Sequence, residues 1–166
     1  MILLTFILNL RRGINQVLVL LGLILLSACS PGKQPFLMVQ TCLVDEKGLG
    51  EFLVAMRAIA QDNGMEYFDR SAETQRELQF MHESNVNVAV SPHTINIGMM
   101  LRDGMGVSAG DLGSSDYQVV IGFAEGSDPA KAREFSSRVI QKLSKRWPLE
   151  TVPEGKGAFP LKNCGN

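Results

Sequence analysis

The 166-residue sequence contains few of the residues that mark the familiar classes of binding and catalytic sites. It has two histidines, three cysteines and a single tryptophan, and it has no run of lysine and arginine. Nucleic-acid binding needs clustered positive charge, so 16 scattered basic residues against 17 acidic ones argue against such a partner. The sequence has no internal repeat and no low-complexity segment, which excludes a solenoid or a disordered polymer. The length then favours one globular domain.

The beginning of the chain also lacks an apolar run long enough to cross a membrane. The uncharged apolar stretch at residues 17–26 is shorter than the roughly 20 residues that a spanning helix needs. Two positive residues, Arg11 and Arg12, precede this stretch, and the small residues Ser27 and Ala28 follow it. A positive start, a short apolar core and a small-residue exit are typical of a secretory signal that is removed from the mature protein.

The end of this segment, Leu26-Ser27-Ala28-Cys29, resembles the lipobox of bacterial lipoproteins. The resemblance implies cleavage before Cys29, after its thiol has accepted a diacylglyceryl group. It also implies three acyl chains, and more than one is needed because a single chain binds membranes only marginally. An aspartate after the cysteine often retains such proteins at the inner membrane; because Ser30 stands there, we expect an outer-membrane anchor facing the periplasm. The alternative is an ordinary secretion signal with a coincidental cysteine.

These features divide the chain into a signal peptide at residues 1–28, a lipidated tether at 29–35 and a single domain at 36–166. Cleavage leaves 138 residues (166 minus 28) and removes two arginines but no acid, so the mature chain carries 14 basic and 17 acidic residues. A chain of this length removes roughly two-thirds of its unfolded surface from water. Because the surface is mildly acidic, we expect the lipid rather than surface charge to hold the protein on the membrane.

Two cysteines remain after Cys29, namely Cys42 near the start of the domain and Cys164 near its end. A pair of thiols in an exported protein most simply forms a disulfide, and two buried free thiols are the alternative. The bond would join the first strand of the domain to its tail and close a long loop. In the chain-entropy model such a loop contributes about 4–5 kcal/mol, which is an upper-end value.

Two amphipathic helices are predicted from apolar residues that recur at steps of three and four. The first follows a capping residue, Asp45, and ends at Gly64. The second begins at Asp128, which precedes a proline, and ends before Pro148. A weakly amphipathic segment at residues 71–81 predicts a further short helix on the surface.

Strands are predicted from apolar runs and from alternation of apolar and polar residues. The expected strands cover residues 36–44, 65–68, 86–90, 94–101, 117–123 and 149–152. The glycine-rich stretch at residues 103–116 is interpreted as the loop of a hairpin. Merging the broken middle strands gives the order β-α-β-β-α-β, which predicts an α+β, ferredoxin-like fold with two helices on one face of an antiparallel sheet.

Within the glycine-rich stretch, residues 106–110 match the pattern G-x-S-x-G, in which a hydrolase serine occupies a tight turn between a strand and a helix. Here Ser108 precedes more loop and then a strand, and both histidines, His82 and His93, come before it in the chain. The order serine, acid, histidine that this fold uses is therefore absent. We expect no catalytic residue, although Ser108 or His93 would carry the alternative, a small envelope hydrolase.

A metal site would need the two histidines together with Asp103 or Glu83, as in a small metalloenzyme. Structural and catalytic metal ligands are usually grouped at tighter spacing than this. We expect no metal and no cofactor.

The remaining hypothesis is a protein that acts by binding another protein. Candidate contact residues are Gly106, Ser108 and Asp111 in the glycine-rich stretch and Trp147 at the end of the second helix. Long loops of unusual composition often carry function, whereas a tryptophan in this position is more often part of the core. We expect a non-enzymatic, lipid-anchored module that binds a protein, such as an inhibitor, an immunity protein or a subunit of an envelope assembly.

Overall fold

The computed structural model describes residues 34–88, 90–111, 117–162 and 164. The predicted signal peptide, the lipidation site Cys29, nearly all of the tether and residues 112–116 of the predicted loop lie outside this range. The chain separates into one unit at Met1–Gln34 and a second at Pro35–Asn166, and the description that follows concerns the second unit. Among the described residues, no helix combines the length and apolar character that crossing a membrane requires.

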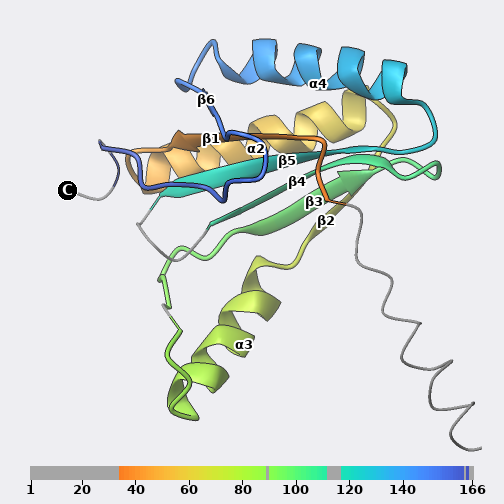
Figure 1. Ribbon diagram of the computed structural model, residues 1–166. Helices are drawn as coiled ribbons and strands as arrows, with labels where there is room; N and C mark the ends of the chain where they lie inside the picture. Colours follow the sequence, from red (N-terminus) through yellow and green to blue (C-terminus); the bar gives the residue numbers. More distant parts are fainter. Residues whose placement is uncertain (1–33, 89, 112–116, 163, 165–166) are drawn as a thin grey trace, which may run out of the picture. The chain divides into compact units, whose positions relative to one another are not determined.

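The second unit is an α+β domain built on one antiparallel sheet (Figure 1), which confirms the predicted class. The six strands lie side by side in the order β2-β3-β4-β5-β1-β6. Along the chain the elements are β1 (Leu37–Cys42), α2 (Glu46–Asp62), β2 (Glu66–Asp69), α3 (Ser71–Glu83), β3 (Asn96–Met100), β4 (Met105–Asp111), β5 (Gln118–Glu125), α4 (Pro129–Leu143) and β6 (Glu150–Thr151).

The predicted four-strand order is incomplete, because the stretch at residues 103–116 is not simply a hairpin loop. Its first part forms β4, which pairs with β3 on one side and β5 on the other. In β4 the apolar residues Met105, Val107 and Ala109 are buried and alternate with glycine and serine. Glycine lowers strand propensity, so its abundance here concealed an alternation that pairing on both sides makes stable.

The predicted strand at residues 86–90 is not found where these residues are described, and both Val86 and Val90 are exposed. The long hairpin loop predicted to begin at residue 103 is also replaced, because a tight turn joins β3 to β4. In this turn the Gly104 amide donates to the Leu101 carbonyl at 3.0 Å. Gly104 has a φ of 87°, a left-handed conformation that glycine adopts without a steric penalty.

Both strong helices pack on the same face of the sheet, as predicted. Local signals set where they begin: the Asp45 carboxylate accepts the Gly48 amide at 2.7 Å, and the Asp128 carboxylate accepts two amides of the first turn of α4. The buried helix residues include Phe52, Met56 and Ile59 of α2 and Phe135, Val139 and Leu143 of α4. They join the buried strand residues in one hydrophobic core.

The third helix, α3, confirms the prediction of a surface helix. None of its residues is buried, and Phe80 is 70 % exposed. Its first turn is bonded to the sheet: Ser71 Oγ accepts the Asn96 amide, and Thr74 Oγ1 accepts a hydrogen bond from the Asn96 side chain. The rest of α3 extends away from the strands (Figure 1).

A disulfide joins Cys42, at the end of β1, to Cys164 in the tail, which confirms the predicted pair. The two cysteines are 122 residues apart in the sequence, so the bond closes nearly the whole domain into one loop.

Candidate functional site

The sheet face opposite the core carries very small residues on its three central strands, β3, β4 and β5. Five residues lie in register across five neighbouring strands: Phe68, Gly98, Ser108, Gly122 and Met38. Successive side chains of a strand point to opposite faces, so these five share the face that α2 and α4 do not cover. We call this surface the open face. Its centre has almost no side-chain bulk.

The glycines of this row are required by close contacts. A Cβ atom at Gly98 would collide with the ring of Phe68, so the ring lies directly over the glycine. A Cβ atom at Gly122 would come within 3.0 Å of Pro35, the first residue of the domain unit. Phe68 remains 41 % exposed, and Met100 on the adjacent row is 48 % exposed. The Phe68 ring and Pro35 therefore cover the two glycines, and Ser108 stays exposed between them.

Ser108 lies at the middle of this row and not on a turn. It pairs in register with Gly98 on one side and Gly122 on the other, and its side chain is exposed. The strand-to-helix turn that positions a hydrolase serine is thus absent at this residue. In the described part of the chain, no hydrogen bond joins Ser108 to a histidine. His93 Nε2 instead lies 2.9 Å from the hydroxyl of Tyr117, whose ring stacks on the imidazole at 4.8 Å.

Gly106 and Asp111, two predicted contact residues, have structural roles in β4. Gly106 is buried, and a Cβ atom there would lie 2.6 Å from the Met99 carbonyl oxygen of the neighbouring strand. Asp111 closes the end of the β3–β4 pair, because its carboxylate accepts the Ile95 amide at 3.3 Å and its own amide donates to the Ile95 carbonyl at 3.2 Å.

Trp147, the fourth predicted contact residue, is part of the core. It is only 7 % exposed, and its ring meets Phe52 of α2 edge to face, with the centroids 5.6 Å apart. A binding role would require an accessible indole, so the structure does not place Trp147 with the open face.

Two residues of the open face were missed by sequence reasoning. Gln40 and Gln118 lie on neighbouring strands, β1 and β5, and both side chains are completely buried. Their amides hold the end of the chain: Gln118 donates to the Phe159 carbonyl at 2.7 Å and accepts the Leu161 amide at 3.1 Å. Gln40 accepts the Phe159 amide at 3.3 Å. The signal for them was a glutamine inside each of two otherwise apolar strands.

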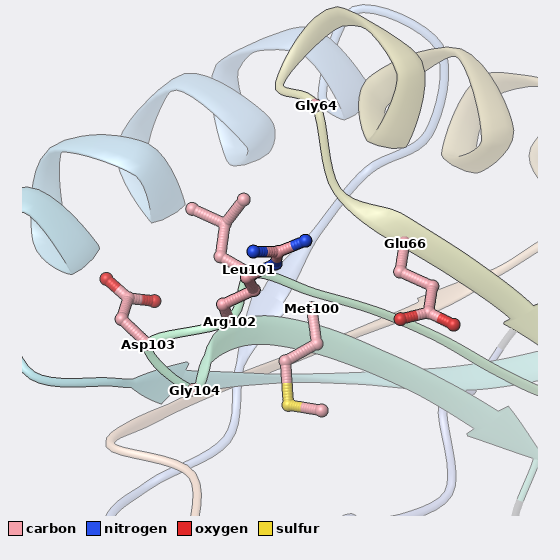
Figure 2. Close-up of a pocket in the computed structure, with 7 residues that line it drawn as sticks. All are labelled: Gly64, Glu66, Met100, Leu101, Arg102, Asp103 and Gly104. Carbon is pink, nitrogen blue, oxygen red and sulfur yellow. The ribbon is translucent and has the colours of Figure 1, made fainter.

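A hollow of about 760 Å³ lies beside the β3–β4 turn (Figure 2). Its lining residues are Gly64, Glu66, Met100, Leu101, Arg102, Asp103 and Gly104. The Asp103 carboxylate is engaged in the turn, where it accepts the Met105 amide at 3.0 Å. In the part of the chain that the structure describes, histidine, cysteine, aspartate and glutamate form no group of three or more that could hold a metal ion.

Near this hollow, Tyr67 of β2 packs partly against the core. Burial raises the pKa of its hydroxyl above the ordinary value of 10.0, and the negative charge of Asp69 adds to the shift. The guanidinium of Arg57 lies 5.2 Å from the ring centroid and opposes the shift. Tyr67 is therefore a neutral side chain at physiological pH and offers no charge to a ligand.

Comparisons with protein-family models, with curated proteins and with solved structures gave no match to this chain.

Proposed function

We propose that the protein is a lipoprotein of the bacterial envelope and that its domain binds a protein partner through the open face, without catalysis. The observation that carries this proposal is the accessible apolar pair, Phe68 and Met100, beside the row of small residues. Aromatic residues and methionine are enriched at the centres of protein interfaces. Between the two covered glycines, Ser108 is exposed and offers a hydroxyl group to the partner.

The proposed anchor favours a partner at the membrane surface. Pro35 contacts the open face at Gly122, and Cys29 lies six residues earlier in the sequence. An extended chain spans at most about 3.6 Å per residue, so an acylated Cys29 is within about 22 Å of Pro35. The open face would then act close to the bilayer, which we propose is the periplasmic side of the outer membrane. An inhibitor, an immunity protein or an assembly subunit fits this position.

Site-specific photocrosslinking in intact cells tests the binding face. A photoreactive amino acid at Phe68 or at Met100 should give a discrete adduct with one partner, which mass spectrometry identifies. The matched control is Val54, an exposed apolar residue on α2. Adducts of equal yield from all three positions, or adducts from Val54 alone, would contradict a binding role for the open face.

Metabolic labelling tests the anchor. Radioactive palmitate should enter the wild-type protein and not the Cys29→Ala variant. Equal labelling of both proteins would remove the lipoprotein part of the proposal and leave the binding face untouched.

We also propose that the sheet is a ferredoxin-like arrangement extended by one hairpin. With β3 and β4 set aside, the remaining order is β2-β5-β1-β6, in which each of two helical crossovers, through α2 and through α4, joins a pair of strands that are not neighbours. A variant in which a short turn replaces residues 96–111 should then retain the helical circular dichroism of α2 and α4. A wholly unfolded variant would argue that β3 and β4 are integral to the fold.

A further inference from the structure

The last part of the chain forms a strap across the open face, which we define as residues 153–162 and 164. It follows β6, and its start is fixed because the Val152 amide donates to the Met38 carbonyl at 3.0 Å. Its end is fixed by the disulfide between Cys42 and Cys164. Between these two points, side chains of the sheet hold the strap backbone by hydrogen bonds, and no strand pairs with residues 153–162 among the described residues.

Those side chains imitate a neighbouring strand. The Gln118 amide uses both its carbonyl oxygen and its nitrogen, one for the Leu161 amide and one for the Phe159 carbonyl. This two-point contact has the donor and acceptor pattern of a backbone peptide group. The pair Gln40 and Gln118 therefore forms a cradle that recognises extended backbone and no particular side chain.

The strap fills this cradle incompletely. The Gln40 side chain is fully buried, its oxygen accepts the Phe159 amide, and its nitrogen has no hydrogen-bond partner. Buried donors in proteins are nearly always paired, and each exception calls for an explanation. An extended peptide with a carbonyl opposite Gln40 Nε2 would satisfy a group that the strap leaves unpaired.

We propose that the strap is a releasable cover, freed when a dithiol reductant opens the Cys42–Cys164 disulfide, and that the uncovered Gln40–Gln118 cradle then takes an extended peptide of a partner. Peptide binding by the cradle rests on the proposed binding function, to which it adds a binding site and a redox switch. A thiolate of the reductant attacks one cysteine sulfur and releases the other as a thiol. The second thiolate of the reductant then displaces the first cysteine, so two protein thiols form as the reductant becomes a disulfide.

The surroundings of the disulfide suit such a reaction. Cys42 lines a hollow of about 480 Å³, together with Glu150, residues 159–162 and Pro148. Cys42 ends β1, whose pairing with β5 extends over all six of its residues. Opening the bond consequently releases the strap and leaves the central strands paired.

Hydrogen exchange followed by mass spectrometry on the full mature chain tests the release. On reduction with dithiothreitol, or in the Cys164→Ser variant, the Phe159 and Leu161 amides should exchange at least about tenfold faster. Peptides from β4 and β5 should stay far better protected than the strap, and their exchange should accelerate no more than the loss in unfolding free energy of the same opened chain, measured by urea titration, requires. Unchanged protection of the strap would overturn the proposal, and so would an equal loss of protection in the strap, β4 and β5, because the bond would then hold the whole fold together and not the strap in particular.

Peptide capture tests the cradle. The strap competes with any added peptide, so the recipient is the full-length double variant Cys164→Ser, Leu161→Pro, in which the strap lacks the Leu161 amide. A fluorescent peptide of the sequence 156–162 should bind this chain, and the further substitution Gln118→Ala should weaken binding at least about tenfold. Oxidised wild-type protein is the matched control and should not bind.

Absence of binding to the double variant, or binding that Gln118→Ala leaves unchanged, would overturn the cradle. The crosslinks proposed at Phe68 and Met100 report on the other half of the open face. Their presence alongside a failed peptide capture would remove this inference alone, whereas their absence would remove the proposed function.

Discussion

The two faces of the sheet are made by the same strands and differ in almost every physical respect. The core face carries residues such as Ile97, Val107 and Ile121, all buried under α2 and α4. The open face carries glycine, serine and glutamine at the alternate positions of those strands. Large buried side chains on the core face stabilise the fold. Small side chains on the open face leave room for the strap and for a partner. Substitutions on the two faces should therefore have different consequences.

The largest effect is expected on the core face. Phe135→Ala removes a fully packed ring from α4 and should lower the free energy of unfolding by about 3–5 kcal/mol. Lys142→Ala on the outer side of the same helix is the control, because its ion pair with Asp62 is solvent exposed and worth at most about 1 kcal/mol. Urea titration of both variants checks this. Equal shifts would mean that the buried side of α4 is misassigned.

The disulfide should rank second. Cys164→Ser opens a loop of 122 residues and should destabilise the domain by about 2–4 kcal/mol, chiefly by releasing the unfolded chain. Because the bond links the strap to the end of β1, whose pairing with β5 does not depend on it, the variant should still unfold cooperatively. Thermal unfolding with and without reductant measures the effect. A wild-type protein whose melting temperature is insensitive to dithiothreitol would contradict it.

A glycine substitution should sharpen the comparison between the faces. Gly98→Ala places a methyl group against the ring of Phe68 and should cost about 1 kcal/mol, since the exposed ring can swing aside. Gly50→Ala is the matched control, because nothing lies within 4 Å of its added Cβ atom and α2 should gain about 0.5–1 kcal/mol.

Combining Gly98→Ala with Phe68→Ala tests the cause of that cost. If the ring is the obstacle, the methyl group should cost nothing measurable once the ring is gone. The same penalty in both backgrounds would show that the glycine is needed for another reason. Chemical unfolding of the four proteins completes the cycle.

The smallest expected effect is a decline in the free energy of unfolding at alkaline pH. The pKa of Tyr67 is raised on folding, so the folded state holds its proton more tightly than the unfolded state does. Its contribution to stability is complete below the ordinary tyrosine pKa of 10.0 and is lost as the pH rises through the higher folded value. Tyr67→Phe should remove this part of the decline in unfolding free energy above pH 10. An identical alkaline profile in the variant would refute the assignment.

The helices and the disulfide were predictable because their signals are local or chemically restrictive. The side chains of Asp45 and Asp128 cap α2 and α4, so residues close together in the sequence specify where each helix begins. Because the prediction assigned Cys29 to the lipid anchor, Cys42 and Cys164 had only each other as partners within the chain. The same local character makes α3 recognisable as a surface helix, because it has no apolar stripe to bury.

Strand β4 and the strap could not be predicted, because both depend on residues distant in the sequence. Gly106, Ser108 and Gly110 resemble a loop until β3 and β5 pair with the strand on both sides. The interpretation of residues 103–116 as a hairpin loop fails for the same reason, because Met105–Asp111 is a strand. Trp147 is core because Phe52 meets it there.

The sequence by itself determined the class of the domain, the start of each strong helix, the apolar stripes that face the core and the pairing of Cys42 with Cys164. Only the tertiary structure decided which surface stayed open and what lies on it. The contact between Gln40 and Phe159 spans 119 residues, and no local pattern at either residue specifies the other. Side-chain alternation tells which residues share a face, whereas strand order, a non-local property, decides which of those residues become neighbours.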